Sequence, residues 1–546
     1  MKIIRPILSL LLPCLLTAQQ VPTTVENFPK PAYVRQAFFQ PQLNVDLQGP
    51  ARFQEFVVDT PVGKQLTLTL RNYLELVMAN NTNIALQRLT VETFKDAVTR
   101  AFAAFDPTAV ARWTSTKQKS PVTNILDSIG TTSNTTIATL TQPANFTYNQ
   151  TLQQGLQFSA SYSGQKTSTT SANSLFNPLV TSNLSFNFTQ PLIRNRGYYI
   201  NRVPIMVAKY NLGQQQFVAR NAIIGLVQAA ESAYWDAVLA RDNLRVQQEA
   251  LKLADAALKR AQQELDLGAM SPLDIYNPQQ NKATAEISVA QAEYTLAQTL
   301  DAMRRQMGAD LSPEYRSMPI KLTESVEMAI EPPPINVDSS ISRALAERPD
   351  LKALQQAVVG DDYSIRGAAN ELRPDLSLIG SYSAYGRGGN FLTNRAGFGE
   401  SLSELFSFGY PTYTFGLQLR FPIRNHTAVA DLADAVAQKK IDTLSRRNIQ
   451  QQIRLDILTA INQVESAKKS VGLAKIALDF AHKYLDAEQK KYDLGTSTVY
   501  FVLQAQQALV NADFAVVQNT VAYRRNLLNL AAKTGTLLEE RGIAVQ

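Results

Sequence analysis

Two stretches of this sequence, residues 264–272 and 491–499, carry a Leu-Gly turn between long runs of helical apolar spacing. Glycine at such a turn supplies the positive φ that ends one helix before the next begins. The apolar residues before the turns keep the spacing of a coiled-coil seam. They are Leu244, Leu251, Ala254, Leu258, Ala261 and Leu265 before Gly268, and Val471, Ala474, Leu478, Ala481, Leu485 and Tyr492 before Gly495. Because both runs keep one phase, the pattern predicts an internal duplication of a long helical hairpin.

Each half of the chain should contain a short helix, a very long helix of about 100 Å and a returning helix about half as long. We predict Asn201 and Thr427 as the N-terminal caps of the long helices. A returning helix and a short helix stacked end to end would match one long helix, so each half supplies two full-length rods. The predicted helices are 66–104, 203–267 and 272–307 in the first half, and 339–370, 427–494 and 499–534 in the second.

Between its short and long helices, each half has segments with strand character. Chain parity requires an even number of strands, because the chain leaves a helix and returns to one on the same side. In the first half, residues 147–164 are therefore either a two-stranded hairpin or part of an outer loop, which gives four or six strands in all. The predicted strands are 107–117, 155–164 and 183–192, then 374–384 and 411–422 around a glycine-rich loop at 386–399; Thr/Ser/Asn-rich loops are expected at 131–136 and 167–174.

The first 18 residues have the charged start, short apolar run and small-residue end of a secretory signal. Cys14, the single cysteine, lies in that run behind Pro13, which argues against a lipoprotein box. No later stretch approaches the roughly 20 apolar residues of a membrane-spanning helix. An exported chain of this kind would meet a membrane through strands or a surface helix. Residues 19–65 are expected to form an extended arm.

Four or six strands cannot close a barrel alone, and bare strand edges are not tolerated inside lipid. Several copies must therefore contribute to one closed barrel. Strands of about ten residues match the thickness of an outer membrane, and helices of about 100 Å would project through the periplasm.

In their order and duplication, several short motifs resemble those of the TolC family of outer-membrane efflux and secretion channels. The motifs are Phe105-Asp-Pro107, Thr189-Gln-Pro-Leu192, Ala344-Leu-Ala-Glu-Arg-Pro-Asp-Leu351, Arg373-Pro-Asp-Leu376 and the two Leu-Gly turns. The resemblance covers roughly residues 66–536. It implies a mixed α and β fold in which three copies form one outer-membrane β-barrel, continued by a periplasmic α-helical coiled-coil barrel. The implied parts are a first repeat at 66–331, a linker at 332–338, a second repeat at 339–536 and a tail at 537–546.

The resemblance further implies a passive exit duct of a tripartite efflux or type I secretion system. Its expected partners are two further copies, a periplasmic adaptor protein, an inner-membrane pump and outer-membrane lipid. The tip that docks the adaptor would be built from Leu267, Gly268, Ala269, Leu494, Gly495 and Thr496.

Channels of this family carry a gate at that tip, and Asp274 and Tyr492 match its motif positions. They are expected to hydrogen-bond across the tip and hold it shut; alternatively Tyr492 is a seam residue and Asp274 a helix-start acid. An acidic ring of better-studied members falls on Phe501 and Gln504 here, and Ser497 stands where an arginine is usual. A constriction at this place would be less charged and more hydrophobic.

Enzyme signatures are not found in the sequence. The two histidines, His426 and His482, are expected on the surface, and no cofactor or metal motif appears. The net charge of +7 is spread out rather than clustered with aromatics, so nucleic acid is not an expected partner.

Besides the duct, a structural coiled-coil protein of the cell envelope would explain the helices, but it would not explain the paired strand blocks.

Overall fold

The computed structural model describes residues 52–61, 63–122, 136–171, 173–268, 271–326, 335–390 and 397–543. The expected signal sequence, Cys14, most of the expected arm and nearly all of the expected linker lie outside these ranges, as does nearly all of the loop expected at 131–136.

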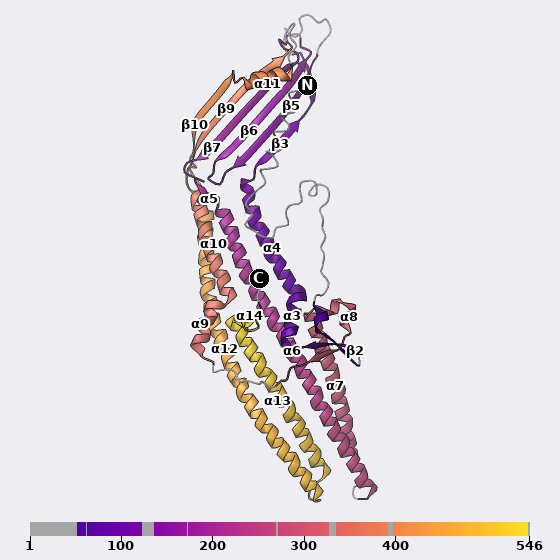
Figure 1. The fold of residues 1–546 in the computed structure, drawn as a ribbon. Helices are drawn as coiled ribbons and strands as arrows, with labels where there is room; N and C mark the ends of the chain where they lie inside the picture. The colour runs from indigo at the N-terminus through magenta and orange to yellow at the C-terminus, as the bar shows by residue number, and fades with distance from the viewer. Residues whose placement is uncertain are drawn as a thin grey trace. The chain divides into compact units, whose positions relative to one another are not determined.

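The strands of both halves form one antiparallel sheet in the order β10-β9-β7-β6-β5-β3 (Figure 1). β4 pairs with β5 beyond the end of β3, so β3 and β4 occupy one edge position in succession. The sheet therefore has six strand positions, and the extra pair is the hairpin β5–β6. The strands are β3 (Thr108–Trp113), β4 (Thr116–Pro121), β5 (Thr136–Thr151), β6 (Gln157–Thr169), β7 (Leu179–Pro191), β9 (Asp375–Gly389) and β10 (Pro411–Arg420).

Two expectations about this region need correction. The glycine-rich segment expected as a loop from residue 386 continues β9 as far as Gly389, and β6 continues into the loop expected at 167–174. The residues of β9 pair with β7 through Gly389, so the ladder satisfies a backbone that the composition alone assigned to a loop.

The two faces of the sheet differ in polarity. Tyr413 lies opposite Tyr382, which lies opposite Phe186, and these side chains share what we call the apolar face. One residue away on each strand, Thr414, Ser381 and Asn187 lie in register on the polar face. Aromatic rings contact one another across five strands of the apolar face: Tyr148, Phe158, Phe186, Tyr382 and Tyr413, with centroids 5.2–6.5 Å apart.

The helical part contains both expected hairpins, α6–α7 and α12–α13 (Figure 1). The predicted bounds of α13 are correct, and those of α6, α7 and α12 differ by one to four residues. The main helices are α3 (Leu70–Asn80), α4 (Thr82–Phe102), α6 (Val203–Asp266), α7 (Tyr276–Gln306), α9 (Val337–Glu347), α10 (Pro349–Glu371), α11 (Phe398–Phe406), α12 (His426–Asp493) and α13 (Val499–Thr534), with the short helices α5 (Tyr198–Asn201), α8 (Pro313–Arg316) and α14 (Leu537–Glu540).

Each of the two short helices predicted before the strands is divided. The first starts after a strand and breaks at Asn81, whose side chain accepts bonds from the backbone of Asn83 and Ile84 and so caps α4. The second breaks before Pro349, which opens α10, where its missing N–H costs nothing. As predicted, the short helix α4 and the returning helix α7 both pack on α6.

Both predicted caps of the long helices are wrong. The side chain of Asn201 donates to the carbonyls of Asn195 and Gly197 instead of capping α6. Asn425, two residues before Thr427, accepts from the backbone of Ala428 and caps α12.

A small second sheet, absent from the sequence prediction, packs beside the middle of α6. It comprises β1 (Val57–Thr60), β2 (Gly63–Leu68) and β8 (Ile320–Leu322), so it joins the end of the expected arm to a segment beyond α7. Leu66, Leu68 and Tyr234 are fully or almost fully buried in the resulting core. Among the described helices, none is both long enough and apolar enough to cross a bilayer.

Where α10 packs against α12, burial and the neighbouring Asp442 raise the pKa of Asp361 from 3.8 to about 6, with a further contribution from Asp362 against the opposing effect of Lys439. A carboxyl whose pKa is raised in the folded state binds its proton more tightly there than in the unfolded chain. Stability from this group is therefore complete below about pH 4 and is lost as the pH rises through about 6.

We expect Asp361→Asn to raise the unfolding temperature at pH 7.5 and to flatten its dependence on pH between 4.5 and 7.5, as measured by circular dichroism. Asp479→Asn, which removes an exposed acid of α12, serves as the control. Equal pH profiles for the two variants would show that Asp361 does not titrate in this window.

Candidate functional site at the hairpin turns

The two hairpin turns share one backbone conformation. Gly268 has φ +73° and Gly495 has φ +72°. The N–H of Gly268 donates to the carbonyl of Leu265, and that of Gly495 donates to Tyr492, each at 2.9 Å. The left-handed conformation closes each long helix at its C-terminus. A methyl group at either glycine would meet no atom within 4 Å, so the backbone angle alone requires glycine there.

Both turns present apolar side chains to the surroundings. Leu267 is 83% exposed and Leu494 is 79% exposed, while Leu273 and Tyr276 extend the exposed apolar surface of the first turn. Exposed leucines at matching positions of two turns form a patch suited to protein contact. Thr496 continues the second turn, with its N–H bonded to the carbonyl of Lys491 at 2.9 Å. Ala269 lies outside the described residues.

A polar cluster links the two hairpins just before their turns, and we call Arg260, Glu264, Tyr492 and Asp493 the tip cluster. Arg260 of α6 donates to Glu264 at 2.9 Å and reaches Asp493 of α12 at 2.7 Å. Its guanidinium lies 4.7 Å from the ring centroid of Tyr492, whose hydroxyl donates to Glu264. Burial, then the bond to Glu264, raises the pKa of Tyr492 to about 12, so its hydroxyl keeps its proton at neutral pH.

Of the two predicted gate residues, Tyr492 lies in this cluster and Asp274 does not. Asp274 is exposed in the turn before α7, where its N–H donates to the carbonyl of Ser271. Within the described part of one chain, the hydroxyl partner of Tyr492 is Glu264. Sequence reasoning missed Arg260 and Glu264, although their spacing of four residues in the last turns of a helix is a recognisable ion-pair signal.

The remaining predicted residues lie near the second turn. Phe501 and Gln504 are both exposed on α13, one turn apart. Ser497 donates its hydroxyl to the carboxylate of Glu488 at 3.0 Å, and Lys491 pairs with the same carboxylate at 2.7 Å. Ser497, which stands where the resemblance implies an arginine, thus bonds to a carboxylate of the helix that precedes its own turn.

Further from the turns, an ion pair joins the arms of the first hairpin. Lys282 of α7 lies 2.8 Å from Asp255 of α6, and Lys259 lies 2.7 Å from the other carboxylate oxygen. Hydrogen bonds from Lys259 and then Lys282 lower the pKa of Asp255 to about 2. The carboxylate of Asp255 therefore stays charged across the physiological pH range, and the ion pair between α6 and α7 persists.

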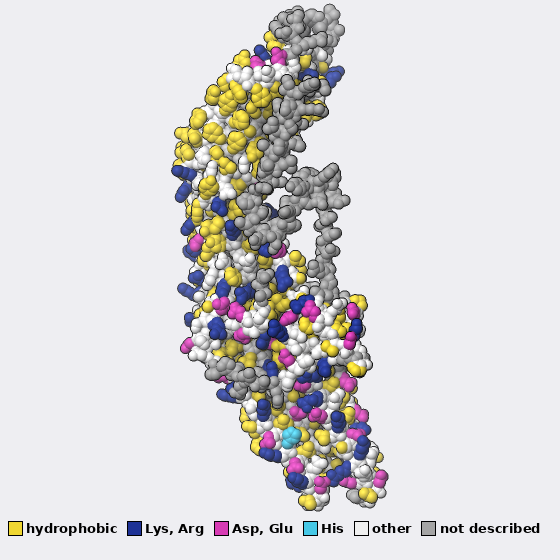
Figure 2. All heavy atoms as spheres, viewed as in Figure 1, with side chains coloured by type: hydrophobic (Ala, Val, Ile, Leu, Met, Phe, Trp, Pro, Cys, Tyr) yellow, Lys and Arg dark blue, Asp and Glu magenta, His cyan; other side chains and the backbone are white. Residues whose placement is uncertain are grey.

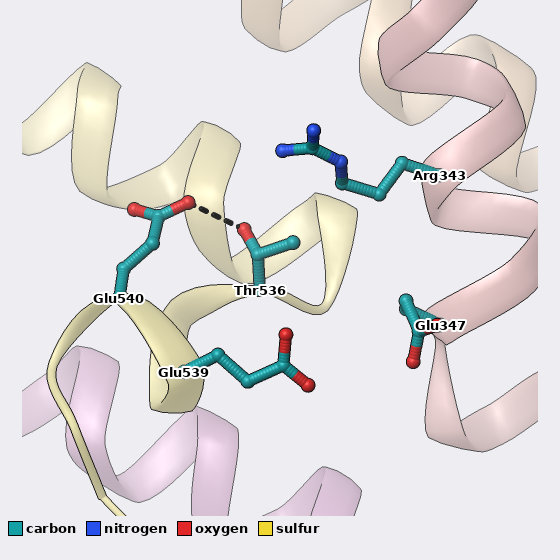
Figure 3. Close-up of a pocket in the computed structure, with 5 residues that line it drawn as sticks. All are labelled: Arg343, Glu347, Thr536, Glu539 and Glu540. Carbon is teal, nitrogen blue, oxygen red and sulfur yellow. Dashed lines mark hydrogen bonds between the residues drawn. The ribbon is translucent and has the colours of Figure 1, made fainter.

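A surface hollow between α9 and α14 is lined by three glutamates that already have partners. Figure 3 shows Arg343 and Glu347 on α9 facing Thr536, Glu539 and Glu540. Glu347 pairs with Lys352, and the hydroxyl of Thr536 donates to Glu540 at 2.6 Å. The bond from Lys352 lowers the pKa of Glu347, which does not suit a general acid.

The histidine prediction is correct, because His426 and His482 are both exposed. In the part of the chain that the structure describes, no group of three or more His, Cys, Asp or Glu residues is arranged to hold a metal ion.

An antiparallel sheet with one apolar face, joined to paired helical hairpins that end in matching turns, defines the class of outer-membrane channel protomers. Figure 2 shows hydrophobic side chains gathered mostly over the strands and charged side chains mostly over the helices. The sequence matches the outer membrane efflux protein family over residues 150–309 and 340–536, which is more than half of the chain. The protein belongs to this family.

Individual relatives are distant. The chain is 24% identical to the outer membrane efflux protein BepC of Brucella suis over 314 residues, which are 58% of this chain and 64% of BepC. It is 22% identical to TolC of Vibrio cholerae over 327 residues, 58% of this chain and 69% of TolC. The matched region thus spans about two thirds of each relative.

Among solved structures, the CmeC outer membrane channel of Campylobacter jejuni matches with a TM-score of 0.60 at 15% identity, over 86% of each chain. The structure of CusC matches with a TM-score of 0.61 at 15% identity, over 90% of this chain and 95% of CusC. These likenesses concern the fold.

Proposed function

We propose that this protein is the passive outer-membrane exit duct of an efflux or type I secretion system, receiving substrate from a periplasmic adaptor and an inner-membrane pump. The observation that carries the proposal is the sheet. Its apolar face suits lipid, its polar face suits a water-filled pore, and its edge strands, β3 with β4 and β10, need partners.

Three copies would satisfy these edges. In one copy β10 runs toward the helices and β3 runs away from them, so β10 of one copy would pair antiparallel with β3 of the next. Six strand positions in each of three copies give a barrel of about 18 strands, wide enough for an aqueous channel. The second repeat supplies two strand positions and the first repeat supplies four, so the added width of the barrel would come from the hairpin β5–β6.

The hairpin turns are the proposed adaptor-docking surface, with the exposed Leu267 and Leu494 beside the two glycines. The tip cluster is proposed to hold the periplasmic end of the pore shut. A contact between Asp274 and Tyr492 at the tip is proposed to contribute to this closure. Phe501 and Gln504 are proposed to line a weakly charged constriction.

Two measurements test the duct. The mass of the purified protein in mild detergent should correspond to three copies, and the protein should conduct ions in a planar bilayer. A structural coiled-coil protein of the envelope would pass no current. A water-soluble monomer would contradict the duct proposal itself.

For the gate, Tyr492→Phe should make the resting pore leakier, because it removes one bond between the two hairpins while leaving the ring in place. A hydrogen bond to a charged group contributes about 1.5–3 kcal/mol when well formed, so we expect a several-fold rise in closed-state conductance in planar bilayers.

The matched control is Tyr484→Phe, which removes a hydroxyl from the same helix two turns away from the tip cluster. Its closed-state conductance should equal that of the unmodified protein. Equal conductance of all three proteins would remove Tyr492 from the proposed gate.

A further inference from the structure

The helix α11 lies in the connection between β9 and β10, and its position on the sheet is defined by register. The strand ends that join helices, at Thr108, Pro191, Asp375 and Arg420, all lie at one end of the sheet. The β9–β10 connection therefore lies at the opposite end, which the duct proposal places outside the cell. From there α11 folds back over β9 and β7 (Figure 1).

Two glycines of β9, Gly386 and Gly388, form the surface on which this helix packs, and we call this surface the seat. A Cβ on Gly386 would lie 2.1 Å from the carbonyl oxygen of Ser401, and a Cβ on Gly388 would lie 2.7 Å from that of Gly397. Backbone can approach this closely only where the strand has no side chain. The glycines that the composition assigned to a loop are therefore the strand residues on which α11 rests.

Specific contacts fix the helix in its seat. The hydroxyl of Ser401 donates to Ser182 of β7 at 2.8 Å and lies 3.1 Å from the carbonyl oxygen of Gly386. Both serines and Leu405 are completely buried. Glu404 accepts from the backbone N–H of Arg387. A buried, fully bonded contact of this kind indicates a fixed part of the fold.

The seat lies on the apolar face. Ser182 lies opposite both Gly164 and Gly386, and Val180 lies opposite Gly388; by the alternation of side chains, all of them share the face of Phe186 and Tyr382. In a closed barrel with a polar lumen, α11 therefore lies on the outside.

Polarity changes along α11 in the direction expected at a membrane surface. Its first half lies at the outer end of the sheet and exposes Glu400 and Ser403, with one aromatic residue, Phe398, exposed by 37%. The chain then descends, so that Phe408 reaches the aromatic row at Tyr382, with centroids 6.3 Å apart. At the end of α11 and just beyond it, Phe406, Phe408 and Tyr410 are exposed by 56%, 48% and 61%.

We propose that α11 is an interfacial helix that packs on the outside of the barrel, with the aromatic side chains at its C-terminus and just beyond it in the outer leaflet. Tyrosine is enriched at membrane interfaces, and phenylalanine is typical of the apolar side of interfacial helices. Lys117, Lys119 and Lys166 lie on the same face near the same end, as expected opposite lipid phosphates. The occupant is lipid rather than another copy, because a neighbouring copy would pair with β10, whereas α11 covers β9 and β7.

This inference rests on the duct proposal, and tryptophan quenching separates the two. Phe406→Trp would be made together with Trp113→Phe, which removes the exposed tryptophan of β3; Trp235 is buried in the helical core and gives a constant background. The protein is reconstituted into phosphatidylcholine vesicles with bromines near the headgroup end of the acyl chains. We expect the emission of the new tryptophan to fall at least about twofold, because interfacial helices bury their apolar side by roughly 5–10 Å.

Tyr294→Trp in the same background places a more exposed aromatic on α7, at 71% against 56% for Phe406, and should not be quenched. If Phe406→Trp co-floats with the vesicles but is quenched no more than Tyr294→Trp, α11 is not in the leaflet and the duct proposal is unaffected. If neither protein co-floats, both proposals fail.

A second pair of variants tests the seat. Gly386→Val should displace α11 and abolish the quenching at position 406, because its Cβ would collide with the Ser401 carbonyl. Gly416→Val, on β10 where a Cβ meets no atom within 4 Å, should preserve the quenching. Full quenching in the Gly386→Val protein would overturn the docked arrangement.

Discussion

Replacing Gly268 or Gly495 with valine is expected to abolish pump-linked export while leaving the sheet inserted in the outer membrane. Both glycines have φ near +70°, a conformation that costs a residue with a side chain about 1–2 kcal/mol and a β-branched residue more. No neighbouring atom would clash, so the penalty acts only on the turn. The backbone must relax, and this moves the exposed Leu267 or Leu494 out of the proposed docking surface.

The measurement combines an export assay in a strain lacking the native gene, across drugs, metals and secreted proteins, with flotation of the variant in outer-membrane fractions. Gly472→Val is the matched control, because this glycine lies in the middle of α12 without positive φ and with open space around it. It should export normally. Normal export by the Gly268 and Gly495 variants would mean that these turns are not the docking surface.

Replacing Arg541 with alanine should destabilise the helical part by about 3 kcal/mol, because it leaves a buried carboxylate without its partner. Glu231 of α6 is 1% exposed and receives two bonds from Arg541, at 2.8 and 2.6 Å. These contacts attach the segment after α14 to α6, where Leu537 and Leu538 are also buried. The described part of the expected C-terminal tail, residues 537–543, is thus attached to the core through Leu537, Leu538 and Arg541.

Trp235 reports on this contact, because its indole N–H lies 3.4 Å from Glu231. Denaturant unfolding followed by its fluorescence, in the Trp113→Phe background, measures the loss. Arg245→Ala breaks an exposed pair within α6 and should cost only about 0.3–0.5 kcal/mol. Adding Glu231→Gln to Arg541→Ala should recover part of the stability, since the stranded charge is removed. Equal losses for Arg541→Ala and Arg245→Ala would contradict the buried-pair argument.

The hairpins were predictable because their signals are local. The bounds of α13 follow from the spacing of apolar residues and from the glycine before it, both of which lie within a few turns of the helix they define. The caps were less predictable. Asn425 and Thr427 both have cap-forming side chains, and the choice between them depends on how the chain leaves β10.

The tip cluster was only half predictable. Tyr492 was identified from its motif position, whereas Arg260 and Asp493 belong to different repeats and meet only when two helices pack. The same holds for Glu231 and Arg541, which lie far apart in the chain.

The sequence by itself determined the duplication, the two hairpins and the alternation of Leu184, Phe186 and Phe188, because helix periodicity, turn glycines and strand alternation act between near neighbours. Tertiary structure alone decided that six strand positions form one sheet, since a hairpin and an outer loop have the same composition until β5 pairs with both β6 and β3. It also decided the role of Gly386 and Gly388. A glycine has no side chain to indicate its surroundings, and only the helix seated on it explains why none is there.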